Sequence, residues 1–322
     1  MIGDFNNVER KDPMNTIVFG GAGFIGAELI KRLCSRGTKV TLYDRNINKK
    51  KLPEGKYNVI EGDFFSETNF KSYLEGKDTI IQLISSVTPS SSMENVLEPY
   101  SKDVIKTLEL IEAAKEVGIK KIIFLSSGGT VYGEVNADLL NEMMPCSPLN
   151  HYGNMKLTIE KILLMYNKLF NMNNIILRVA NPYGAGQSPD KKIGAISIFM
   201  HRILNNEPIS IYGEGQIVRD YIEISDVCEA IITSLKYEPP RNDSDPIFNV
   251  GTGRGLSLLE IIRLIEMVTG TDAIVKFYSE RSYDVKRNVL DPRKAQEKLG
   301  FYSKVAAEKG IESLYRSIRG IN

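Results

Sequence analysis

The chain has 322 residues, 42% of them hydrophobic and 25% charged, and its 41 Lys+Arg against 40 Asp+Glu give a net charge of +1. This length and composition are typical of a soluble protein with one large α/β domain, or a large domain that carries a smaller one. The balanced charge argues against a nucleic-acid-binding protein. Residues 1–15 lack the apolar core of a signal peptide, and the most apolar stretch is too short to span a bilayer. We therefore expect a cytoplasmic protein without a membrane partner.

Cysteine and histidine are sparse. Cys34, Cys146 and Cys228 are far apart and form no C-x-x-C pair, and the only histidines are His151 and His201. These numbers argue against a disulfide framework, a thiolate zinc site and a histidine-rich metal centre. No metal site is expected.

The first half of the chain alternates strand-like and helix-like segments, which predicts a doubly wound, Rossmann-type α/β fold with a parallel sheet. The expected strands are 16–19, 39–43, 57–60, 79–84, 121–125 and 175–179. The two longest helices are expected over 96–117 and 152–170.

The character of the sequence changes after Asn181, where Pro, Gly and polar residues interrupt shorter apolar runs. We therefore expect a nucleotide-binding domain over 1–180 and a smaller, mixed α/β substrate domain over 181–322. Segments near 226–252 are expected to return to the first domain.

A glycine-rich segment, GGAGFIG over 20–26, follows the first expected strand and opens the first helix. Glycine lets the backbone turn tightly and approach a pyrophosphate, which the free N–H groups of the helix terminus then bind. Asp44 ends the second strand, where a carboxylate can accept hydrogen bonds from an adenosine ribose and repel a 2′-phosphate. This pattern favours NAD over NADP, although Arg45 next to it weakens the preference. Asp63 is either an adenine contact or a simple turn residue.

Tyr152 and Lys156 form a Y-x-x-x-K pattern at the start of an expected helix. Residues at i and i+4 share one helical face, so the phenol and the ammonium can point into the same cleft. A nearby ammonium stabilises a phenolate, which makes the tyrosine usable as a general base.

These motifs and those of the second half occur in the order found in nucleotide-sugar 4-epimerases. The chain resembles this branch of the extended short-chain dehydrogenase/reductase family from Thr16 to about Ser317. The further motifs are LSSGGTVYG (125–133), LRVANPYG (177–184), IYGEG (211–215), RDYI (219–222), FNVGTG (248–253) and RSYDV (281–285).

The resemblance implies a role for each matching residue. Tyr152 would be the base and Lys156 its partner, and Arg219 and Arg281 would clamp the diphosphate, for which a guanidinium fork is suited. Further NAD contacts would come from Gly20, Gly23, Phe24, Ile25, Gly26, Asp44, Arg45, Asp63, Phe64, Leu83 and Val179. The other substrate contacts would be Asn181, Ile211, Tyr212, Asp284 and Asn288.

The sequence departs from the family pattern at three positions. Gly128 stands where the family has a catalytic Ser or Thr, so Thr130, or else Ser127, is expected to supply that hydroxyl. Gln82 replaces a His after the fourth strand, and Asp103 replaces an Asn in the long helix. Both changes alter the local hydrogen-bond network.

The fold alone does not select a reaction. Dehydratases and decarboxylases of the family carry carboxylates where this chain has Gly129 and Thr130, which argues against both activities. The resemblance implies NAD-dependent C4 epimerisation of a nucleotide-activated hexose, UDP-glucose/UDP-galactose or their N-acetylated forms, through a 4-keto sugar. A 4-keto-sugar reductase that uses the same residues once is the main alternative. A non-catalytic NAD-sensing module is a third interpretation, but it gives no reason to retain Tyr152 with Lys156.

Two further expectations concern the sugar and the assembly. Asn288 lies seven residues after Arg281, where the family residue faces the C2 substituent of the sugar. Because Asn is smaller than Tyr and its amide can bind an acetamido carbonyl, we expect room for N-acetylated hexoses. The resemblance also implies a homodimer formed through the helices over 96–117 and 152–170.

Overall fold

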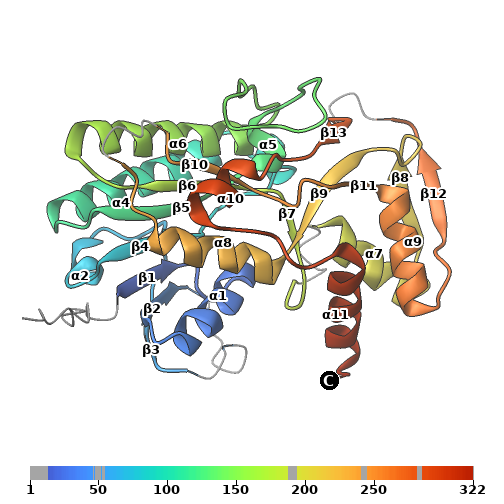
Figure 1. The fold of residues 1–322 in the computed structure, drawn as a ribbon, viewed down its shortest axis with the longest axis horizontal. Coiled ribbons are helices and arrows are strands. Elements are labelled where there is room, and N and C mark those ends of the chain that lie inside the picture. Colours follow the sequence, from blue (N-terminus) through green and yellow to red (C-terminus); the bar gives the residue numbers. More distant parts are fainter. Residues whose placement is uncertain are drawn as a thin grey trace, which may run out of the picture.

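The computed structural model describes residues 14–45, 47, 52, 55–187, 194–240, 245–280 and 285–321. At its centre lies a seven-stranded parallel sheet with the strand order β10-β6-β5-β4-β1-β2-β3 (Figure 1). This arrangement confirms the expected Rossmann-type fold. The strands are β1 Asn15–Phe19, β2 Lys39–Asp44, β3 Tyr57–Glu61, β4 Thr79–Gln82, β5 Lys121–Ser127, β6 Ile175–Val179 and β10 Ile247–Val250.

Each face of this sheet has its own hydrophobic core, because successive side chains of a strand point to opposite faces. Val18 of β1 packs in one core with residues of α1 (Phe24–Ser35) and α8 (Ile224–Lys236). Its neighbour Ile17 packs in the other core, under α4 (Ile105–Glu116) and α6 (His151–Phe170). Both faces are thus covered, as in other doubly wound sheets.

The remaining long helices surround a third core, on the right in Figure 1. They pack around the two-stranded parallel sheet of β8 and β12, while β9 pairs with β7, β11 and β13. The helices are α7 Ala195–Leu204, α9 Leu258–Thr269 and α11 Ala307–Arg319; the strands are β7 Asn181–Tyr183, β8 Ile209–Tyr212, β9 Val218–Glu223, β11 Gly255–Ser257, β12 Val275–Tyr278 and β13 Arg287–Asn288.

Short helices complete the structure where the chain leaves the strands. They are α2 Lys71–Leu74, α3 Ser91–Glu94, α5 Gly128–Val131 and α10 Arg293–Leu299.

Two expected elements differ from the structure. The fourth strand ends at Gln82 rather than Ile84, because the Gln82 side chain accepts a hydrogen bond from the backbone N–H of Ile84 (3.1 Å) and turns the chain out of the sheet. The long helix begins as a π-helical segment, η1 (Pro99–Val104), which leads directly into α4. Residue periodicity in the sequence does not distinguish a π-helical turn from an α-helical one.

Candidate active site

A cavity of about 270 Å³ opens at the carboxyl edge of the sheet, between β1 and β4. The chain runs from β1 through β2 to β3 on one side and from β4 through β5 to β6 on the other, so the strand order reverses at this point. Ligands of doubly wound sheets bind at such a switch point. The cavity is lined by Gly20, Ala22, Gly23, Asp44, Arg45, Gly62, Asp63, Phe64, Phe65, Leu83, Ile84 and Ser85. Seven of the expected NAD contacts therefore lie around one cavity.

The glycine-rich turn leaves the amino end of α1 open toward this cavity. Gly20 adopts a φ of +85°, and a Cβ on Gly26 would lie 2.2 Å from the Gly20 carbonyl oxygen, so α1 can approach the turn only with glycine there. Gly23 caps α1 without a side-chain hydrogen bond, and the first turn contains no acidic residue. The N–H groups of that turn are therefore available to a phosphate.

Asp44 is fixed in the wall of the cavity. Its two carboxylate oxygens accept hydrogen bonds from the backbone N–H groups of Ala22 (3.0 Å) and Arg45 (2.8 Å). Asp63 accepts one from the N–H of Phe65 (3.2 Å), as in a turn. With the open helix terminus at one end and a carboxylate on the wall, these residues fit a dinucleotide. Phe24 and Ile25 lie in the first turn of α1 and are absent from the cavity lining.

Tyr152 and Lys156 lie together on α6, against the carboxyl end of β5. The Lys156 ammonium donates a hydrogen bond to the Leu125 carbonyl (2.9 Å), and its nitrogen lies 5.6 Å from the centre of the Tyr152 ring. Lys156 is buried, whereas Tyr152 is partly exposed. The helix thus presents a phenol beside a buried cation, as the Y-x-x-x-K spacing predicts.

The surroundings shift both groups. Burial raises the pKa of Tyr152 to about 12, and the negative charge of Asp103 acts in the same direction, while a hydrogen bond with Ser127 opposes it. Burial lowers the pKa of Lys156 to about 8, and the charges of Asp103 and Glu160 oppose that shift. A hydrogen-bond donor or a cation that stabilises the phenolate therefore has to offset the effect of burial before Tyr152 can act as a base near neutral pH.

Of the two candidate hydroxyls, Ser127 is the one that contacts Tyr152. Thr130 instead donates a long hydrogen bond to the Ser127 carbonyl (3.4 Å) within the turn of α5. These contacts favour Ser127 over Thr130 as the candidate hydroxyl.

The absence of a side chain at Gly128 has a steric cause. A Cβ there would lie 2.5 Å from a methyl carbon of Leu290 and 3.1 Å from the Arg178 carbonyl oxygen. Leu290 is completely buried, so the space that a Ser or Thr would need is occupied by a side chain from the second half of the chain.

Asn288 does not face an open sugar pocket. Its side chain is 1% exposed and donates to the Gly128 carbonyl (3.1 Å), while its amide oxygen has no hydrogen-bond partner among the described residues. The argument that Asn288 leaves room for an N-acetyl group is therefore corrected, because Asn288 is packed under the turn that carries Ser127. The printed sequence gave no sign of this burial.

The remaining expected contacts lie along β6 to β9, with Val179 expected for NAD and the others for the substrate. Val179 is buried at the end of β6, and the Asn181 amide donates to the Asp220 carbonyl (2.9 Å). Asn181 also borders Gly129, since a Cβ there would lie 3.6 Å from the Asn181 amide oxygen. Arg219 donates to the carbonyl of its neighbour Val218 (2.9 Å). Arg281 and Asp284 lie outside the described residues.

Ile211 and Tyr212 lie on opposite faces of β8. Ile211 is completely buried in the third core, so its side chain does not line a cleft, and the expectation for it is corrected. Tyr212 is 37% exposed, and its ring lies 5.6 Å from that of Tyr278, its register partner on β12. Tyr278 was missed because β12 was not expected from the sequence.

A buried ion pair between α6 and β6 was also missed. Glu160, four residues after Lys156 on α6, binds Arg178 of β6 (2.7 Å) and accepts a hydrogen bond from Ser126. Its i+4 spacing from Lys156 in an expected helix was a signal that placed it on the same face. This pair fixes α6 against β5 and β6.

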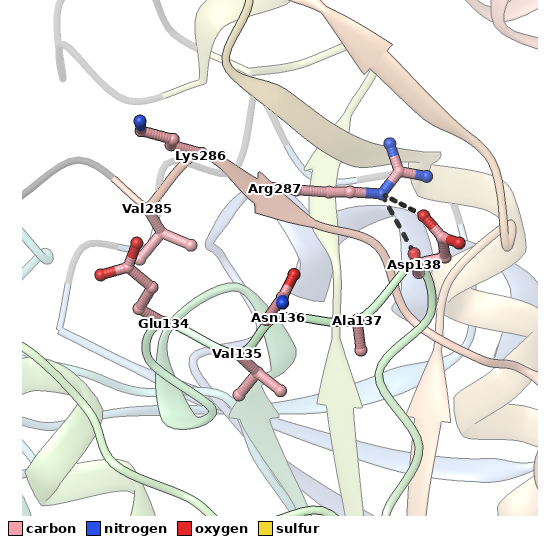
Figure 2. A pocket seen from close by; sticks show the side chains of 8 residues that line it. All are labelled: Glu134, Val135, Asn136, Ala137, Asp138, Val285, Lys286 and Arg287. Atoms are coloured by element: carbon pink, nitrogen blue, oxygen red, sulfur yellow. Dashed lines mark hydrogen bonds and ion pairs between the residues drawn. The ribbon is translucent and has the colours of Figure 1, made fainter.

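A second cavity, of about 380 Å³, lies between residues 134–138 and the segment that enters β13 (Figure 2). Arg287 closes one side through a hydrogen bond to the Asp138 carbonyl (3.2 Å) and an ion pair with its carboxylate (3.8 Å). The lining of this second cavity contains none of the expected site residues. We assign it no role.

The described residues contain no group of three or more His, Cys, Asp or Glu that could hold a metal ion. None of the helices in the described ranges is long and apolar enough to cross a membrane.

The fold and the site define an enzyme class, the extended short-chain dehydrogenases/reductases. The model of the NAD dependent epimerase/dehydratase family matches residues 16–251, and the chain belongs to that family. An Escherichia coli dTDP-4-dehydro-6-deoxyglucose reductase is 33% identical over 94% of this chain and 97% of its own. A Mycolicibacterium smegmatis UDP-glucose 4-epimerase is 31% identical, and the match covers 92% of this chain and 96% of the relative. The structure of a Thermotoga maritima UDP-glucose 4-epimerase with UDP-glucose superposes with a TM-score of 0.88 at 30% identity, covering 95% of this chain and 99% of that one.

The packing at Gly128 yields a stability prediction. Gly128→Ser should lower the free energy of unfolding by about 1–3 kcal/mol, because the new side chain overpacks the site against Leu290. Combining it with Leu290→Ala should cost less than the sum of the single changes, since the shorter side chain makes room. Chemical denaturation of the four proteins measures both effects.

Gly129→Ala is the matched control, because the atoms nearest to its Cβ lie 3.6–3.9 Å away. If Gly128→Ser and the wild type had the same midpoint denaturant concentration of unfolding, Leu290 would not exclude a side chain at this position.

Proposed function

We propose that this chain interconverts the C4 epimers of a UDP-hexose, UDP-glucose and UDP-galactose, with NAD as cofactor. The proposal rests on the grouping of Tyr152, Lys156 and Ser127 at the carboxyl end of β5, the strand next to β4, at which the cavity of the switch point opens. Gly129 and Thr130 supply no carboxylate that could eliminate water from the sugar. Because Asn288 is buried, it gives no support for N-acetylated hexoses as substrates, and the proposal does not include them.

The residues divide the work of proton transfer. Tyr152 removes the proton of the 4′-hydroxyl, and Ser127 passes that proton to the phenolate through the hydrogen bond that the two share. Lys156 stabilises the phenolate by its charge, which the Leu125 carbonyl orients. Bound NAD would supply the acceptor for the hydride of C4 and, once reduced, the donor that returns it. The site would have to let the 4-keto sugar turn between the two transfers.

Cofactor preference and substrate anchoring follow from the same positions. Asp44, held at the cavity wall by backbone N–H groups, would accept hydrogen bonds from the ribose hydroxyls of NAD and would repel the 2′-phosphate of NADP. Arg219 on β9, with Arg281, binds the diphosphate, and the exposed ring of Tyr212 lies along the nucleobase.

A 4-keto-sugar reductase remains the second candidate. The observation in its favour is the Escherichia coli relative, a dTDP-4-dehydro-6-deoxyglucose reductase 33% identical to this chain. Such an enzyme would use Tyr152 once, as an acid, and would consume external NADH or NADPH.

Activity without added cofactor separates these candidates. Purified protein incubated with UDP-galactose alone should form UDP-glucose, because an epimerase regenerates its bound NAD in each cycle. Tyr152→Phe should reduce turnover by about 10²–10⁴-fold with binding nearly unchanged, since it removes the general base. Chromatographic resolution of the two epimers provides the measurement. If conversion required stoichiometric NADH or NADPH, the reductase would replace the epimerase.

The choice between the two hydroxyls gives a second prediction. Ser127→Ala should lower kcat by about 10- to 100-fold, because a hydrogen bond to a charged group contributes about 1.5–3 kcal/mol. Thr130→Val, the matched control, should retain turnover within about twofold, because its hydroxyl bonds only to the turn. Steady-state kinetics measures kcat of both variants. A larger loss of kcat in Thr130→Val than in Ser127→Ala would assign the role to Thr130.

The expected homodimer has a surface that fits it. Apolar side chains are exposed on α4 and α6, namely Ile105 (50%), Leu108 (36%), Met165 (46%) and Leu169 (62%). Leu169→Glu should shift sedimentation toward the monomer, because it places a charge in this surface. Met267→Glu on α9, at an 80% exposed position outside the surface, should leave the dimer unchanged. A wild-type protein that sediments as a monomer would contradict the dimer.

A further inference from the structure

Asp103 is a buried carboxylate next to the catalytic pair, and the mechanism above does not use it. It lies in η1, which packs against α6, and its side chain is only 2% exposed. Its two oxygens accept hydrogen bonds from the backbone N–H of Ser86 (2.9 and 3.2 Å), and the Ser86 hydroxyl donates to one of them. The carboxylate is therefore held rigidly between η1 and the loop that follows β4.

Within the described ranges of the chain, no ion pair balances the charge of Asp103. The other carboxylate that acts on Lys156 is Glu160 of the same helix, and Glu160 is already paired with Arg178 of β6 (2.7 Å). Lys156 likewise forms no salt bridge within the described ranges, and the charge of Asp103 acts on it across the contact between η1 and α6.

Burial works against the charged form of Lys156, because an ammonium in a low-dielectric site tends to lose its proton. A neutral amine cannot stabilise the phenolate of Tyr152. The Leu125 carbonyl orients the ammonium but carries no net charge. The unpaired carboxylate of Asp103 supplies the missing counter-charge.

We propose that Asp103 is a positioning residue that holds Lys156 in its ammonium form and thereby sets the pH range in which Tyr152 acts as a base. An Asn at this position, which the sequence resemblance leads one to expect, would preserve the hydrogen bonds to Ser86 and lose the charge. The effect of Asp103 on the pH range of catalysis rests on the proposed function of Tyr152. Its effect on the protonation of Lys156 does not.

The effect has a definite direction. The charge of Asp103 raises the pKa of both Lys156 and Tyr152. The groups that face the pair are Asp103 from η1, Glu160 from α6 with its partner Arg178 from β6, and the Ser127 hydroxyl from β5. The ring of His151, which precedes Tyr152, is bonded to the Tyr100 hydroxyl (2.9 Å). Removing the charge of Asp103 should therefore lower both pKa values together.

The first experiment measures Lys156 without any turnover. Protein labelled with ¹³C at the lysine Cε is titrated by NMR, and the Lys156 resonance is assigned as the one that Lys156→Met lacks. In Asp103→Asn the midpoint should fall by on the order of one pH unit, as expected for the loss of a close opposite charge. Ser86→Ala, which removes one hydrogen bond and keeps the carboxylate, should leave the midpoint unchanged.

The second experiment measures the pH profile of kcat. In Asp103→Asn both limbs should move to lower pH, whereas a purely structural role would lower the profile without moving it. An unchanged Lys156 midpoint in folded Asp103→Asn, or an equal shift in Ser86→Ala, would overturn the proposal. If the NMR midpoint moves but no UDP-hexose is epimerised, the proposed function fails and the action of Asp103 on Lys156 stands.

Discussion

The buried ion pair between Glu160 and Arg178 fixes the geometry on which the site depends. It joins α6 to β6 at 2.7 Å, with Ser126 of β5 as a third partner. Because Tyr152 and Lys156 precede Glu160 by two and one i+4 steps on the same helix, this anchor also sets their direction. Removing one partner of such a pair costs about 3–5 kcal/mol, since it leaves an isolated buried charge.

The same anchor connects the site to the far edge of the sheet. The Arg178 guanidinium lies 4.9 Å from the centre of the Tyr132 ring, and the Tyr132 hydroxyl donates to Asn249 of β10 (2.7 Å). Leu290 and Asn288 then pack against Gly128 from the second half of the chain. The turn that carries Ser127 is thus held from both halves, which explains how this chain can lack a side chain at Gly128.

The sequence predicted the elements whose signals are local. Alternating apolar segments predicted the strands of the sheet, and the glycines followed by Asp44 predicted the cavity, because strand positions and turn geometry depend on short stretches of chain. It failed where side-chain direction depends on packing between distant segments. Ile211 and Asn288 matched motif positions but are buried by neighbours that no local pattern reveals. The field of Asp103 on Lys156 likewise arises only when η1 packs against α6.

In the proposed reaction, hydride leaves C4 of the sugar and returns to the same carbon within one bound complex. UDP-galactose deuterated at C4 tests it directly, in protein without added NADH or NADPH. The UDP-glucose formed should retain the deuterium at C4 in full, as measured by mass spectrometry and NMR. Loss of the label from the product, or no product until NADH or NADPH is added, would contradict it.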